Sequence, residues 1–145
     1  MTAPPLGICC RGTIAKVNDG DTLIFLVFDV IPVSIRLRDC WAAETLRAKT
    51  PVERRLGEAA GQALRDFAEG EPGVLSINTV DARKLKDILT IDRVLGDVWL
   101  ADDPEMDLAS WMRRGNFAFR TKAELGEYVK SMETAALGDP TPPSP

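Results

Sequence analysis

The chain of 145 residues contains no histidine and only three cysteines, Cys9, Cys10 and Cys40. A zinc site built from Cys and His cannot find its usual four ligands in such a chain. The lack of histidine also excludes Ser-His-Asp and Cys-His nucleophilic catalysis. Two of the cysteines are adjacent and the count is odd, which argues against a disulfide framework. Any chemistry must therefore come from carboxylates, arginines, lysines or the single tyrosine, Tyr128.

Long hydrophobic runs are absent as well. No apolar stretch approaches the roughly 20 residues needed to span a bilayer, and the first ten residues lack the basic and apolar regions of a secretory signal. We therefore expect no membrane partner. A cytoplasmic protein, or a component of a particle such as a virion assembled inside a cell, is the predicted setting.

Basic residues are too few for a protein that coats nucleic acid. The 18 Lys and Arg are outnumbered by 22 Asp and Glu, which gives a net charge of −4, whereas nucleic-acid coating draws on clustered positive charge. An enzyme that grips one or two phosphates locally is still compatible with this balance. At 45% hydrophobic and 28% charged residues, the chain has the composition of one globular domain.

Five segments have the pattern of β-strands. They span residues 8–17, 22–28, 33–40, 74–80 and 93–100. Asn18-Asp19-Gly20 predicts a hairpin turn, because these residue types tolerate the positive φ of such turns. In the third segment Ile35 and Leu37 alternate with polar residues, as in a strand with one buried face.

Three helices complete the expected architecture. The first begins at Pro51 with Thr50 as its cap, the second spans residues 108–114, and the third follows a capping box at Thr121 and Glu124 to about Leu137. A helix between the third and fourth of five strands is typical of the OB-fold barrel. The predicted class is α+β, with one domain over residues 1–137 and a disordered Pro-rich tail over 138–145.

Acids and arginines gather in residues 17–44, around the first hairpin and the third strand. The segment opens with VNDGDT at 17–22 and closes with RLRDCWAAE at 36–44. Such a cluster is costly in a core and useful at a phosphate. These residues therefore favour a metal-dependent phosphodiester site on a small β-barrel.

The same motifs resemble those of the staphylococcal nuclease (thermonuclease-like) family, over about Ile8 to Lys122. The resemblance rests on four motifs, which are VNDGDT, RLRDCWAAE, RVLGDVWL at 93–100 and DLASWMRRGNFA at 107–118. Their order and spacing fit the family. The resemblance implies an OB-fold enzyme that hydrolyses DNA or RNA phosphodiesters with Ca²⁺.

Specific roles follow from the resemblance at matching positions. Asp21 corresponds to a metal-binding aspartate, with Asp19 as a second acid beside it. Arg36 and Arg93 correspond to the arginines that grip the scissile phosphate. Glu44 corresponds to the glutamate that orients or deprotonates the attacking water.

The chain departs from the family where a second metal-binding aspartate stands. That position is Trp41, and the next residue is Ala42, where the family uses the backbone carbonyl. Asp39 is a candidate replacement ligand, because residues i and i+2 of a strand share a face. The predicted metal ligands are therefore Asp21, Asp39 and the Ala42 carbonyl. We expect Trp41 to be buried, although an exposed indole could stack on a base.

Two alternatives of other classes stay open. The missing aspartate and acidic composition favour a degenerate nuclease fold that binds protein partners in a larger assembly such as a phage particle. A purely OB-type nucleic-acid binder is the third possibility. It is disfavoured by the scarcity of aromatic residues, with one tyrosine in the chain.

Overall fold

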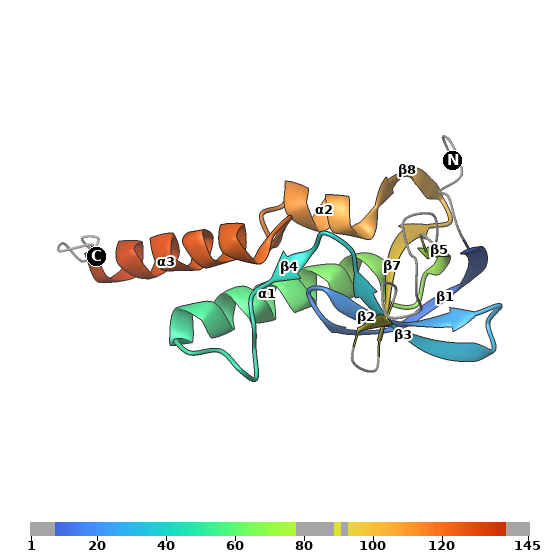
Figure 1. The fold of residues 1–145 in the computed structure, drawn as a ribbon, viewed down its shortest axis with the longest axis horizontal. Coiled ribbons are helices and arrows are strands. Elements are labelled where there is room, and N and C mark those ends of the chain that lie inside the picture. Colours follow the sequence, from blue (N-terminus) through green and yellow to red (C-terminus); the bar gives the residue numbers. More distant parts are fainter. Residues whose placement is uncertain (1–7, 78–88, 91–92, 139–145) are drawn as a thin grey trace.

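The computed structural model describes residues 8–77, 89–90 and 93–138, and its arrangement is drawn in Figure 1. In chain order the elements are β1 (Ile8–Asp19), β2 (Thr22–Val27), β3 (Ile31–Leu37), β4 (Trp41–Ala42), α1 (Pro51–Ala68), β5 (Pro72–Ile77), β6 (Leu89–Thr90), β7 (Arg93–Leu100), β8 (Asp103–Asp107), α2 (Leu108–Arg114), β9 (Ala118–Phe119) and α3 (Lys122–Gly138).

Five of the strands form a closed barrel. The hydrogen-bonded order is β3-β2-β1-β5-β7, and parallel pairing of β3 with β7 closes it, with Ile35 opposite Val94. With three helices this is an α+β fold with an OB-like barrel, which confirms the architecture predicted from the five strand segments. α1 lies between the third and fourth barrel strands along the chain, also as predicted.

Some local predictions need adjustment. Residues 103–107, which were not among the five predicted strand segments, form β8, which pairs with β7. Trp41 and Ala42 form a short strand, β4, that pairs with β9. The basic segment with Arg83, Lys84 and Lys86 and the residues of the tail from 139 onward lie outside the described residues, as does the end of the strand predicted over 74–80.

The barrel interior is filled by aliphatic and aromatic side chains from every barrel strand and from α1 and α2. The largest fully buried ones are Phe25, Ile14, Leu23, Ile35, Leu37, Leu64, Leu75, Leu108 and Met112. Burial of a side chain of this size stabilises the folded state by roughly 1.5–3 kcal/mol. The core thus holds the ends of β2, β3 and β7 in place, where the candidate site lies.

Small residues let α1 approach the first hairpin closely. A Cβ on Gly20 would lie 2.7 Å from Ala42 Cβ and 2.8 Å from Ala60 Cβ, and a Cβ on Gly57 would lie 2.5 Å from the Glu44 carbonyl oxygen. The helix therefore presses the 42–44 segment against the turn that carries Asp21.

Helix caps follow the sequence prediction. The Thr50 hydroxyl accepts a hydrogen bond from the Glu53 N–H at 3.2 Å, and the Thr121 hydroxyl accepts one from the Glu124 N–H at 3.2 Å. Figure 1 shows α3 running alongside α1 and extending beyond the barrel. Among the described helices, none combines the length and the apolar character that crossing a bilayer requires.

Candidate functional site

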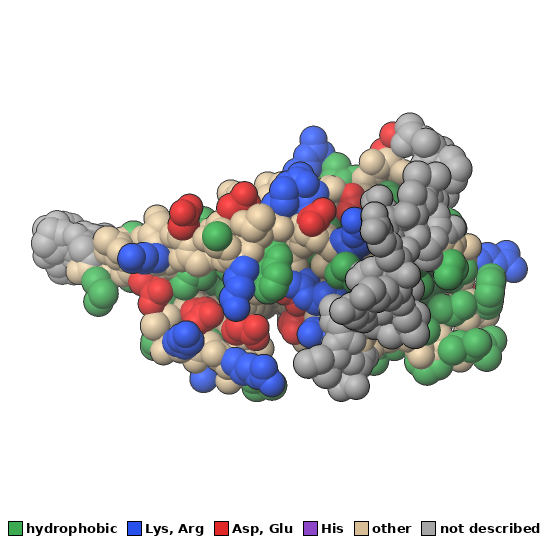
Figure 2. All heavy atoms as spheres, viewed as in Figure 1, with side chains coloured by type: hydrophobic (Ala, Val, Ile, Leu, Met, Phe, Trp, Pro, Cys, Tyr) green, Lys and Arg blue, Asp and Glu red, His purple; other side chains and the backbone are tan. Residues whose placement is uncertain are grey.

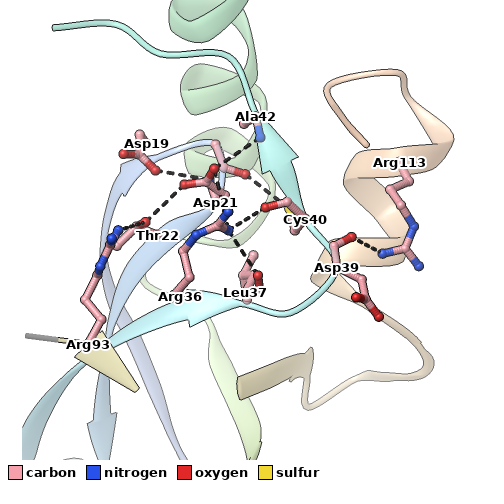
Figure 3. A network of polar contacts seen from close by, with 11 residues as sticks. Asp19, Asp21, Thr22, Arg36, Leu37, Asp39, Cys40, Ala42, Arg93 and Arg113 are labelled. Atoms are coloured by element: carbon pink, nitrogen blue, oxygen red, sulfur yellow. Dashed lines mark hydrogen bonds and ion pairs between the residues drawn. The ribbon is translucent and has the colours of Figure 1, made fainter. Parts of the chain in front are cut away.

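Asp21 lies at the centre of the polar network in Figure 3. Its carboxylate accepts a hydrogen bond from the Ala42 N–H at 3.1 Å and one from the Thr22 hydroxyl at 3.1 Å. Its backbone carbonyl accepts from the Leu37 N–H at 2.9 Å. Asp21 therefore joins the first hairpin to the end of β3 and to β4.

Asp19 and Asp21 form a carboxyl pair on one turn. Asp19 Oδ1 accepts a hydrogen bond from the Asp21 N–H at 3.1 Å. Burial raises the pKa of Asp21 to about 7, the neighbouring Asp19 acts in the same direction, and Arg36 and the Ala42 N–H oppose them. Two acids held together in this way gain from a cation between them.

Arg36 is the guanidinium nearest to Asp21. Its Nη1 lies 3.5 Å from Asp21 Oδ2 and donates to the backbone carbonyls of Leu37, at 3.1 Å, and of Cys40. The residue is 9% exposed, and its Cζ lies 4.7 Å from the centroid of the Trp41 ring. Within the described part of the chain, no hydrogen bond engages its Nε or Nη2.

Arg93 reaches the same network from another strand. It begins β7, and its Nη1 donates to the Thr22 hydroxyl at 3.0 Å. Thr22 stands opposite Arg36 in the register of β2 and β3. The structure therefore brings Asp21, Arg36 and Arg93 together around Thr22, a linking residue that the sequence analysis did not single out.

Glu44 lies two residues after β4, on the segment that Ala42 ties to Asp21. It is exposed, and its backbone carbonyl faces Gly57 of α1. Its side chain makes no hydrogen bond to the residues that the structure describes. The carboxylate is thus available to a substrate or water, as an acid–base role requires.

Asp39 does not share a strand face with residue 41. β3 ends at Leu37 and β4 begins at Trp41, and Asp39 occupies the turn between them with φ 50°. Its backbone carbonyl accepts from Arg113 Nη1 at 2.6 Å, and Figure 3 shows its exposed carboxylate pointing away from Asp21. The geometric argument for Asp39 as a replacement ligand fails for this reason.

Trp41 is not buried, contrary to expectation. Its exposed fraction is 37%, because the two-residue β4 lies at the surface and places Ala42, not Trp41, toward the core. The indole lies over the Arg36 guanidinium instead. In the sequence, only the short distance of Trp41 from Arg36 and Arg38 pointed to this contact.

The donor set fits a hard divalent cation at two carboxylates. Ca²⁺ accepts carboxylate, carbonyl and water oxygens in loose geometry, and the Asp19–Asp21 pair supplies two carboxylates. Among the described residues there is no group of three or more acidic, cysteine or histidine side chains placed to hold a metal ion. Backbone carbonyls such as that of Ala42, and water, would complete the coordination.

Comparisons with protein-family models and with curated proteins return no match for this chain.

Proposed function

We propose that this protein is a Ca²⁺-dependent nuclease that hydrolyses phosphodiester bonds of DNA or RNA at the site around Asp21. The observation that carries the proposal is the convergence of two guanidiniums from separate strands on one carboxylate and its neighbouring hydroxyl. Arg36 lies 3.5 Å from Asp21, and Arg93 lies 3.0 Å from Thr22. The resemblance to thermonucleases assigns the same residues to phosphate binding.

The arginines are suited to the charge that develops in the reaction. A phosphate under attack gains negative charge on its equatorial oxygens, and planar guanidiniums offer paired donors to such oxygens. The Nη1 of Arg36 is held by the carbonyls of Leu37 and Cys40, which orients Nε and Nη2 for a phosphate. Loss of one preorganised donor commonly lowers a rate by about 10²–10³-fold.

The carboxylates would provide cation binding and proton transfer. Asp21 and Asp19 would hold the cation, which supplies polarisation of a phosphoryl oxygen and acidification of a bound water. Glu44, exposed on the adjacent segment, would accept the proton of the attacking water. Its attachment to α1 through the Gly57 contact keeps its backbone at a fixed place beside Ala42.

A binding module without catalysis is the second candidate. The position at which thermonucleases carry another metal-binding aspartate is Trp41, and its indole covers Arg36. A fold with one carboxylate pair and a shielded arginine could serve as an assembly module in a particle such as a phage virion. The two candidates differ in whether divalent cations produce strand cleavage.

Digestion of plasmid DNA and of single-stranded DNA and RNA tests the proposal. Reactions would contain Ca²⁺, Mg²⁺, Mn²⁺ or EDTA, with Glu44→Gln and Arg93→Ala as test variants. Glu58→Gln and Arg55→Ala, at exposed positions of α1, are matched controls for the same chemical changes. We expect Ca²⁺-dependent cleavage that the test variants lower by about 10²-fold or more and the controls leave intact. Absence of metal-dependent cleavage in the unmodified protein favours the binding module.

A further inference from the structure

We propose that Trp41 is a stacking platform for a nucleobase next to the phosphate bound at Arg36, so that the site takes single-stranded nucleic acid. This inference rests on the proposed function and specifies its substrate. It begins from a contact that the fold alone does not require, an exposed indole lying over the guanidinium of the phosphate-binding strand.

The contact leaves one side of the indole for a ligand. Arg36 is 9% exposed and lies under the ring, with its Cζ 4.7 Å from the ring centroid, whereas Trp41 is 37% exposed. Trp41 therefore contacts Arg36 and is still accessible to solvent, and the base would stack on the ring face turned away from Arg36. A base on that side would complete a stack of guanidinium, indole and base, in which each contact is of a kind that stabilises nucleic-acid complexes.

Further aromatic rings continue from Trp41 toward α3. Trp41 pairs directly with Phe119 in the β4–β9 register, so the two side chains lie on the same face of that small sheet. The Phe119 ring centroid lies 4.8 Å from that of Tyr128. Successive bases of a flexible single strand could therefore stack on these rings beyond Trp41.

A small cavity adjoins the same rings. It has a volume of about 110 Å³, and Phe119, Tyr128, Phe117, Asn116 and Ala43 are among its lining residues. Ala43 follows β4 directly, so the cavity lies beside the segment that leads from Trp41 to Glu44. The aromatic lining of the cavity therefore lies next to the chain segment that carries Trp41 and Glu44.

Charge and base accessibility together favour a single strand. The net charge of −4 offers little general attraction for a phosphate backbone, so stacking must contribute a larger share of the affinity. In a duplex the faces of each base are covered by its neighbours, whereas unpaired bases can lie on aromatic side chains. A single indole beside the phosphate site thus selects unpaired nucleotides.

Equilibrium binding of a labelled octathymidylate, followed by fluorescence anisotropy in EDTA at one fixed salt concentration, tests this inference. The comparison strand is an abasic octamer with the same phosphates. We expect Trp41→Ala to raise the Kd for octathymidylate about 5- to 150-fold, to leave the abasic strand unchanged, and Trp41→Phe to have a smaller effect. Phe28→Ala, which truncates an exposed aromatic on the distant β2–β3 turn, is the matched control and should bind normally.

Tryptophan emission gives a second readout that does not need the alanine variant to fold. Octathymidylate should quench the emission of the unmodified protein, and the quenching should be lost in Trp41→Phe while binding persists. The stacking role would be overturned if Trp41→Ala lost affinity equally for the abasic and the normal strand, or if it bound octathymidylate as tightly as the unmodified protein. This holds even if Ca²⁺-dependent cleavage is observed. An unmodified protein that neither binds nor cleaves single strands overturns the nuclease proposal itself.

Discussion

The backbone N–H of Ala42 donates to Asp21 Oδ2 across 3.1 Å, and this bond ties the segment after β3 to the turn between β1 and β2. The two residues are 21 positions apart in the chain. Because Glu44 follows on the same segment, the bond sets the distance between the acid that would hold a cation and the acid that would take a proton. Asp21 is therefore both a structural link and the centre of the candidate chemistry.

Asp21→Asn should separate these two roles. The amide oxygen can still accept the Ala42 hydrogen bond, and a buried negative charge beside Asp19 is removed. We expect the free energy of unfolding at pH 8 to be unchanged or higher, because desolvation of the Asp21 carboxylate is no longer required. Ca²⁺-dependent cleavage should fall by about 10²-fold or more, since an amide is a weaker ligand than a carboxylate for a hard cation. Urea unfolding and strand-cleavage assays on the same preparation measure both effects.

Asp39→Asn is the matched control for that substitution. Asp39 is exposed and its carboxylate points away from Asp21 (Figure 3), so the same chemical change should not alter cation binding. Its effect on stability, through the charge that Asp39 presents to Asp97, should stay below about 0.5 kcal/mol. Calorimetric titration with Ca²⁺ measures cation binding in both variants. A loss of binding in Asp39→Asn equal to that in Asp21→Asn would restore Asp39 as a ligand.

Gly57→Ala should weaken the protein although alanine favours helices. In α1 an added methyl group would lie 2.5 Å from the Glu44 carbonyl oxygen and 2.7 Å from that of Ala43. The usual gain of about 1 kcal/mol for alanine over glycine is expected to be exceeded by the cost of moving this backbone. We predict a net loss of roughly 1–3 kcal/mol in urea unfolding and slower cleavage, because Glu44 moves with its carbonyl.

Gly126→Ala in α3 makes the same change without the contact. A Cβ at this position meets nothing within 4 Å, so the variant should gain roughly 0.5–1 kcal/mol and keep the cleavage rate. Equal effects of the two substitutions would show that the contact between α1 and the 43–44 segment is not constraining.

The barrel was predictable because its signals are local. Alternation in 33–37 predicts a strand and the Asn18–Gly20 signal predicts a hairpin, and the structure confirms the strand and the β1–β2 hairpin. The turn itself lies at Gly20 and Asp21, and none of residues 18–21 has the positive φ that was expected. Arg36 is also buried between Ile35 and Leu37, so the burial of β3 does not alternate. That Asp21 and Arg36 belong to one site was implied by the family resemblance of their motifs, and the two side chains lie 3.5 Å apart. What the sequence could not give was the course of residues 38–40, where Asp39 adopts φ 50° and ends the strand geometry.

The exposure of Trp41 depended on contacts far along the chain. β4 has two residues and pairs with β9, which lies more than 70 positions later. No local pattern specifies so short a pairing, and the large apolar side chain of a tryptophan by itself favours burial. Thr22 was missed for a related reason, since its role as a bridge appears only when Arg93 of β7 is placed beside β2.

The β2–β3 turn stores strain that a polar substitution should relieve. Phe28 and Asp29 have φ of 53° and 63°, and Phe28 is 60% exposed. Figure 2 shows hydrophobic side chains gathered at the end of the molecule where these strands turn. Asparagine adopts positive φ more readily than phenylalanine, so Phe28→Asn should raise the free energy of unfolding by about 1 kcal/mol.

Val30→Asn distinguishes relief of strain from loss of exposed apolar surface. Val30 is 74% exposed in the same turn but is not among the residues with positive φ. Its substitution should change stability by less than about 0.5 kcal/mol in urea unfolding. A comparable gain in both variants would assign the effect to the loss of exposed apolar surface and not to backbone strain.

Asp97 should make stability depend on pH. Burial raises its pKa to about 6 from 3.8, Arg38 opposes the shift from 3.7 Å, and Asp107 and Asp39 add to it. The folded state therefore holds this proton more tightly than the unfolded state. Stability falls as the pH rises from about 4 to 6, and the penalty is complete above that range. Relative to the unmodified protein, Asp97→Asn should become more stable by roughly 1–3 kcal/mol between pH 4 and pH 7.5.

Arg38→Gln tests the role of Asp97 through its ion-pair partner. Removing the cation that lowers the pKa of Asp97 should move the titration to higher pH and deepen the loss of stability at pH 7.5, because the buried carboxylate then ionises without a partner. Urea midpoints at a series of pH values for both single variants and the double variant measure the coupling. If Asp97→Asn and the unmodified protein differed by the same amount at pH 4 and pH 7.5, Asp97 would not be the titrating group, and the slope would belong to other carboxylates.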